Sequence, residues 1–88
     1  MKLSDRVRLD DAVALRPERF GALAYSYRDR QLFFVDHALL PFVESAGGHT
    51  LGEIAGDLEA AGKVSKEALP RLLTVLEGLR RRGILHVL

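Results

Sequence analysis

The sequence predicts an α+β fold in which a three-stranded antiparallel sheet is followed by three helices, and a short C-terminal strand could complete it. Two observations predict this order. In residues 21–27, large side chains (leucine and tyrosine) alternate with small ones (alanine and serine), with the period of two that is typical of a strand. From residue 36 onward, apolar side chains recur every three or four positions, as they do in helices. The 88 residues suffice for one domain with one small core.

The chain begins with a polar stretch. Residues 1–11 are mostly charged or polar, so we expect a flexible N-terminal arm ahead of a single domain at residues 12–88. Residues 12–16 predict a first short strand. We expect Pro17 to stop this strand, because proline cannot donate a ladder hydrogen bond.

A hairpin follows. Residues 21–27 form the clearest strand, residues 28–31 are a polar break of hairpin length, and residues 32–35 are a short aromatic and β-branched run. The run is apolar on both faces, with Leu32 and Phe34 on one face. A half-exposed antiparallel strand normally alternates with polar residues, so something is expected to cover its second face.

Cap residues mark the first two helices. Asp36 is the expected N-cap of a short helix that ends at the glycines at 47–48. Thr50 and Glu53 have the spacing of a capping box, which predicts a second helix ending at Gly62.

The third helix begins either after a Ser65 cap or with Pro70 as its first residue, and it ends at the arginine and glycine run of residues 80–83. Residues 84–87 could then add a terminal strand. Apolar residues cover an arc of about 160° on this helix, wider than the ~100° of a core-facing stripe. One margin of the helix is therefore expected to be exposed.

Composition excludes several classes of function. The net charge is only +1, which argues against a nucleic-acid partner. The chain has no cysteine, so thiol chemistry and thiolate metal sites are excluded. No apolar run approaches the ~20 residues of a membrane span, and the first residues lack the apolar core of a signal peptide. We expect a cytoplasmic protein with no membrane partner.

Candidate catalytic and metal-binding groups are sparse. The histidines His37, His49 and His86 lack the spacing that presents two imidazoles to one metal, so we expect no metal site. Asp10 and Asp11 are interpreted as solvated surface carboxylates. No serine has the sequence context of a nucleophile elbow. The sequence therefore predicts a protein that is not an enzyme and needs no cofactor.

The exposed apolar strand and the wide apolar face of the third helix together indicate a receptor for an extended peptide. The backbone of an edge strand can pair with an incoming strand, and the helix can select its side chains. Two other interpretations remain open, namely that both features fill the protein's own core or that they form a dimer interface.

Several stretches carry a family resemblance. They are Ala14–Tyr25, the run Arg30–Val35, the glycines at 47–48 and the Thr-x-x-Glu-Ile pattern of residues 50–54. In these stretches the chain resembles PqqD-like RiPP recognition elements, and among them the peptide chaperones of the mycofactocin system. The resemblance implies a winged-helix-like domain that binds the leader region of a small ribosomal precursor peptide as an added strand. It also implies delivery of that peptide to a radical SAM maturase, which carries the cofactors.

The resemblance also implies a set of peptide-binding residues, taken from the third strand and the third helix. These residues are Phe33, Phe34, Val35, Leu72, Val75 and Leu79, with Arg71 or Arg82 near an acidic leader.

Two further functions compete with this interpretation. Residues 50–79 also have the pattern of a helix-turn-helix, which would make the chain a winged-helix DNA-binding domain. Against it, Glu67 and Glu77 lie among the cations of the third helix. The chain could instead be a structural subunit or homodimer whose exposed strand pairs with its own copy.

Overall fold

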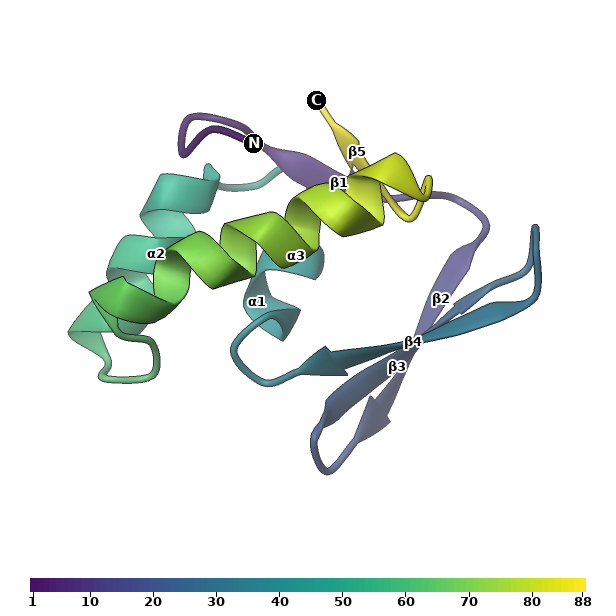
Figure 1. Cartoon of the computed structure of the whole chain (residues 1–88), viewed down its shortest axis with the longest axis horizontal. Helices are drawn as coiled ribbons and strands as arrows, with labels where there is room; N and C mark the ends of the chain where they lie inside the picture. The colour runs from purple at the N-terminus through teal and green to yellow at the C-terminus, as the bar shows by residue number, and fades with distance from the viewer.

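A three-stranded antiparallel sheet lies beside a group of helices in the computed structural model, which describes residues 1–88 (Figure 1). The strand order is β2-β3-β4, formed by β2 (Val13–Glu18), β3 (Gly21–Ser26) and β4 (Gln31–Asp36). The helices α1 (Leu40–Val43), α2 (Leu51–Ala60) and α3 (Leu69–Arg81) follow. These elements confirm the predicted fold class.

Pro17 lies inside β2 instead of ending it. It is opposite Ala22 of β3, and β2 continues to Glu18. The prediction failed because β2 is an edge strand that pairs only with β3. A proline whose missing N–H faces away from the neighbouring strand removes no ladder hydrogen bond.

The tight pairing of β3 with β4 depends on Gly21. This residue lies opposite Asp36 and has φ +141°, and a Cβ atom added to it would overlap the carbonyl oxygen of Val35. The alanines of β3 face the core, since Ala22 and Ala24 are both buried. The two strands therefore approach each other closely at the end of the hairpin nearest the helices.

The capping residues act largely as the sequence predicts. Thr50 Oγ1 accepts the Glu53 N–H at 3.1 Å, and Glu53 Oε1 accepts the Thr50 N–H at 2.8 Å, which confirms the capping box of α2. Asp36 Oδ1 accepts the Leu39 N–H at 2.9 Å, so Asp36 caps the turn that leads into α1 and not the helix itself.

The cap predicted at Ser65 is present, whereas Pro70 is the second residue of α3 (Leu69–Arg81) and not its first. Ser65 caps a single 3-10 turn, η1 (Lys66–Ala68), by accepting the Ala68 N–H at 3.3 Å. This turn runs directly into α3, where Pro70 occupies the first turn and so removes no helical hydrogen bond.

The N-terminal segment differs from the flexible arm that the sequence predicts. Residues 7–9 form β1 (Val7–Leu9), which pairs with β5 (Leu85–Val87) in a second, two-stranded antiparallel sheet. Val7 is fully buried. The pairing confirms the short C-terminal strand, and it brings the two ends of the chain together beside α3 (Figure 1).

Asp10 joins this small sheet to the larger one, and it is buried, unlike the solvated carboxylate that the sequence predicts. Its Oδ1 atom lies 2.6 Å from His86 Nε2 of β5. Its Oδ2 atom accepts the Ala12 N–H at 2.9 Å and an Arg28 N–H at 3.0 Å. The bond from His86 and then the bond from Ala12 hold the pKa of Asp10 below its usual value.

The Asp10 interactions make stability depend on pH. A carboxylate whose pKa is lower in the folded state stabilises the fold above its unfolded pKa of about 3.9, and this stability is lost as the pH falls through the folded pKa. We expect Asp10→Asn to lower the thermal midpoint at pH 7 and the difference from the wild type to shrink below about pH 4. Thermal unfolding followed by circular dichroism at pH 7, 5 and 3 measures this difference. A constant difference across that range would contradict the role of the charge.

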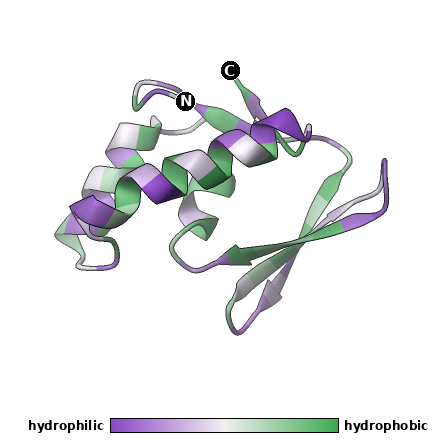
Figure 2. Ribbon diagram, in the orientation of Figure 1, coloured by the Kyte–Doolittle hydropathy of each residue, from purple (hydrophilic) through white to green (hydrophobic).

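The core lies between the helices and the buried face of the sheet. It is built from the inward faces of α2 and α3, with Leu58, Leu72 and Leu76 buried, together with Phe42 of α1 and Val35 of β4. Hydrophobic positions recur along α3 and run along much of β4 (Figure 2). None of the helices is long and apolar enough to cross a bilayer.

Candidate functional site

The open edge of β4 is the first component of the site. β4 pairs only with β3, so its other edge has no neighbouring strand. The Tyr27 N–H donates to the Ala12 carbonyl at 2.8 Å, on the β2 side of β3. Because successive residues of a strand direct their backbone groups to opposite sides, Ser26 and every second residue before it face β4.

This alternation identifies which residues of β4 face outward. Phe33 and Val35 lie opposite Ala24 and Ala22, so their backbone groups face β3. Leu32, Phe34 and Asp36 direct theirs to the open edge. The Asp36 carbonyl accepts the Leu39 N–H at 3.2 Å. Leu32 and Phe34 therefore offer two N–H and two C=O groups to an added strand.

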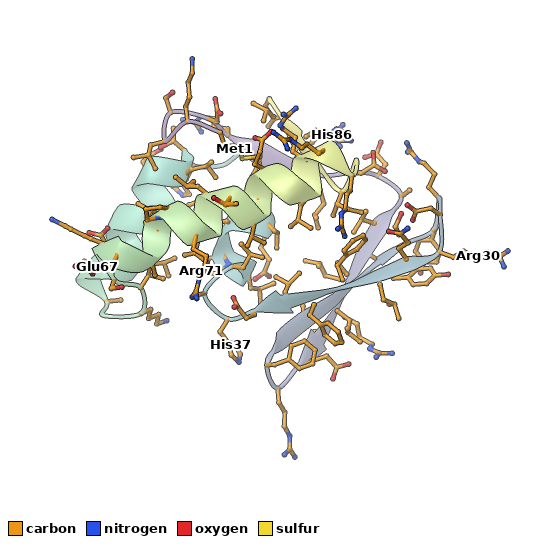
Figure 3. All side chains as sticks on the ribbon, viewed as in Figure 1. Met1, Arg30, His37, Glu67, Arg71 and His86 are labelled. Carbon is orange, nitrogen blue, oxygen red and sulfur yellow. The ribbon has the colours of Figure 1, made fainter.

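One flank of α3 faces this edge. Arg71, Val75, Gly78 and Arg82 follow one another at steps of four, three and four residues, which places them in one row along the helix. The helix runs opposite to β4, since Arg82 lies near Phe33 while Arg71 lies at the other end of the strand. Figure 3 shows Arg71 pointing from α3 into the space beside the end of β4.

Two hollows occupy the space between α3 and β4. The hollow of about 370 Å³ at the Arg71 end is lined by Phe20, Phe34, Asp36, Leu39, Arg71, Leu72 and Val75. The hollow of about 300 Å³ at the other end is lined by Phe33, Phe34, Val75, Gly78, Leu79 and Arg82. Phe34 and Val75 line both hollows. We call the two together the β4–α3 groove.

The groove contains seven of the eight residues for which the resemblance implies peptide binding. Val35 is the exception. Its side chain is 1% exposed and packs in the core with Ala22, so only its place on the strand connects it to the groove. Sequence reasoning missed Phe20 and Gly78. Phe20 comes to the groove through the turn between β2 and β3, which residue spacing along one helix or one strand could not reveal.

Apolar side chains in the groove are unusually exposed. Phe34 is 78% exposed and Val75 is 43% exposed. Phe34 makes an edge-to-face contact with Phe20, with ring centroids 5.5 Å apart. Large apolar side chains held at the surface in this way indicate a binding surface.

The two arginines at the ends of the groove carry free positive charge. The Arg82 guanidinium carbon lies 5.5 Å from the centre of the Phe33 ring, within cation–π range. No carboxylate lies within 4.0 Å of the Arg71 or Arg82 guanidinium, although other arginines of the chain form such pairs. They are eleven positions apart along α3, a rise of about 16 Å, which is the length of about five residues of strand. The groove is therefore apolar in its middle, with the Arg82 cation at one end and the Arg71 cation at the other, where the Asp36 carboxylate also lines the hollow.

A larger hollow of about 460 Å³ lies mostly on the outer face of the sheet, lined by Ala14, Leu15, Arg16, Leu23, Tyr25, Tyr27 and Leu32. It has no helix wall, and backbone groups face it only at its margin. We therefore favour the β4–α3 groove, where free backbone groups, apolar walls and free charge meet. No three His, Cys, Asp or Glu side chains cluster anywhere in the chain.

Comparisons with known proteins identify relatives of the chain. Residues 6–86 match the model of the peptide chaperone MftB family. The chain is 39% identical over 74 residues to the peptide chaperone MftB of Mycobacterium ulcerans (strain Agy99). The aligned region covers 81% of this chain and 66% of that protein, just under two thirds of its length. No solved structure matches the chain.

Proposed function

Because the chain belongs to the peptide chaperone MftB family, we propose that it is a non-catalytic cytoplasmic chaperone that binds the leader region of a ribosomal precursor peptide in the β4–α3 groove. The family name describes a peptide chaperone, a role that needs no catalytic residues. The observation that carries the proposal is the open edge of β4 opposite a flank of α3 that exposes Val75 between two arginines.

The peptide binds as an additional strand of the sheet. Leu32 and Phe34 exchange up to four backbone hydrogen bonds with it, which supply affinity without regard to sequence. Its side chains alternate between the two faces of the extended sheet. Those on the helix side meet Val75 and Leu79, while those on the other side meet Phe34 and Phe20.

Charge adds selectivity. Arg71 and Arg82 lie about five strand residues apart, so acidic side chains at both ends of the bound segment would pair with both guanidinium groups. An apolar segment flanked by acidic residues fits this groove. A leader with a cationic residue at the Arg82 end is disfavoured, because two like charges would approach each other there.

The bound peptide is presented to a radical SAM maturase in mycofactocin biosynthesis. The maturase, and not this chain, carries the cofactors of the reaction. Strand addition suits this role, because it fixes the leader through its backbone and leaves the rest of the precursor free to enter another active site.

Binding of a labelled peptide tests this function. We expect a fluorescein-labelled synthetic leader of the mycofactocin precursor from the same organism to bind with saturable anisotropy, while a labelled random DNA duplex does not bind. Sedimentation of the free protein at several concentrations shows whether copies of the chain pair through the same edge. Saturable binding of DNA without binding of the peptide would overturn the proposal in favour of the winged-helix function. A stable dimer that excludes the peptide would overturn it in favour of the structural one.

A further inference from the structure

Nothing in the structure of the free protein requires a glycine at position 78. Glycine disfavours the interior of a helix more than any residue except proline. The backbone at Gly78 does not have a positive φ, so any residue except proline could adopt its conformation. A Cβ atom there would meet no atom within 4 Å. Neither backbone geometry nor packing within the chain accounts for this glycine.

Gly56 in α2 shares these properties, so they do not by themselves indicate a site. The difference lies in the surroundings. Gly56 is exposed and lines none of the hollows described above. Gly78 is half-buried and forms part of the wall of the hollow at the Arg82 end of the groove.

The other walls of this hollow define what it can hold. Phe33, Phe34, Val75 and Leu79 supply apolar surface, and Arg82 lies at the rim with its guanidinium near the Phe33 ring. On the row of residues that faces β4, Gly78 is the one position without a side chain. Between Val75 and Arg82, therefore, no side chain of this row fills the groove.

We propose that Gly78 is a specificity-determining residue, which leaves space for one large apolar or aromatic side chain of the bound peptide. This proposal rests on the proposed function. The side chain enters from the helix-facing side of the added strand and packs between Phe33 and Val75. An aromatic ring there would also lie within reach of the Arg82 guanidinium.

Substitution of Gly78 separates a binding role from a structural one. Long side chains on a helix point back toward the residues three and four positions earlier. The side chain of Gly78→Leu would therefore extend over Val75 and fill the hollow. We expect Gly78→Leu to weaken binding of the synthetic leader at least about 10-fold. We expect Gly78→Ala to raise the thermal midpoint of the free protein by about 3–6 °C.

Gly56→Ala is the matched control. It should raise the thermal midpoint similarly and leave the affinity for the leader unchanged. A second measurement locates the partner side chain, by changing each large apolar residue of the leader to alanine in turn. One of these changes should weaken binding to the wild type but not to Gly78→Leu, because the two changes remove the same contact.

The outcomes distinguish this proposal from the one on which it rests. If the wild type binds the leader and Gly78→Leu binds it equally well or better, the specificity role of Gly78 is wrong and the chaperone function stands. If the folded wild type does not bind the leader, the proposed function itself is wrong, and this inference fails with it.

Discussion

Val35→Asp will strongly destabilise the fold. The Val35 side chain is 1% exposed and lies opposite the buried Ala22, so a carboxylate at this position has no water and no partner. An unpaired buried charge costs about 4 kcal/mol or more, a large part of the 5–15 kcal/mol that stabilises a typical domain. We expect the thermal midpoint to fall by about 16 °C or more. Circular dichroism and the dispersion of the amide proton spectrum measure this loss.

Leu32→Asp is the control for this prediction. Leu32 lies on the same strand, but its side chain is 60% exposed, so the new carboxylate stays in water. This variant should keep a cooperative transition close to that of the wild type. A Val35→Asp protein that unfolds at the wild-type temperature would show that β4 is not packed in the core as described.

Phe34→Asp will leave the fold intact and remove most of the peptide affinity. Phe34 is 78% exposed, and its edge-to-face contact with Phe20 is worth only about 0.5–1.5 kcal/mol to the free protein. Phe34 lines both hollows of the groove, so a bound strand would cover it and desolvate the new carboxylate. We expect at least about 30-fold weaker binding of the leader, equivalent to about 2 kcal/mol. Fluorescence anisotropy measures the affinity.

Tyr27→Asp is a closely matched control, because Tyr27 is also exposed and also lies in an edge-to-face pair. The centre of its ring is 4.7 Å from the centre of the Tyr25 ring. It lies at the end of the hairpin and lines neither hollow of the groove. Its substitution should change the affinity less than about twofold, within the effect of an ordinary surface change. Equal losses from Phe34→Asp and Tyr27→Asp would move the site away from the groove.

Features encoded by neighbouring residues could be predicted from the sequence. The capping box of α2 needs only Thr50 and Glu53, three positions apart, and both hydrogen bonds are present. The hairpin and the cap at Ser65 are local in the same sense. In each case the signal and the structure that it specifies lie within a few residues, so no knowledge of the rest of the fold is needed.

The N-terminal strand could not be predicted in this way. Val7 is buried because β1 pairs with β5, at the other end of the chain. The apolar residues Leu3, Val7 and Leu9 of this polar stretch do not indicate that a partner strand lies at the other end of the chain. The prediction of a solvated Asp10 is wrong for the same reason, since its partners His86 and Arg28 come from distant parts of the sequence.

The candidate site was predictable in outline and not in detail. Spacing along β4 and α3 identifies the two walls, but it does not show which face of each wall is covered by the core. Val35 and Phe34 are adjacent and similarly apolar, and only the packing of the sheet buries the first and exposes the second. A signal for Gly78 was present, as a glycine interrupting an apolar helix, but its place in the groove depends on the position of β4.

Amide hydrogen exchange tests strand addition most directly, because the groove presents two kinds of amide on one strand. The Leu32 and Phe34 N–H groups face the open edge, while those of Phe33 and Val35 face β3 and serve as internal controls. With saturating leader peptide, we expect exchange at Leu32 and Phe34 to slow at least about 10-fold, because a new ladder bond must open before each proton exchanges. Exchange at Phe33 and Val35 should change much less. A leader that binds while Leu32 and Phe34 exchange as fast as in the free protein would contradict the account.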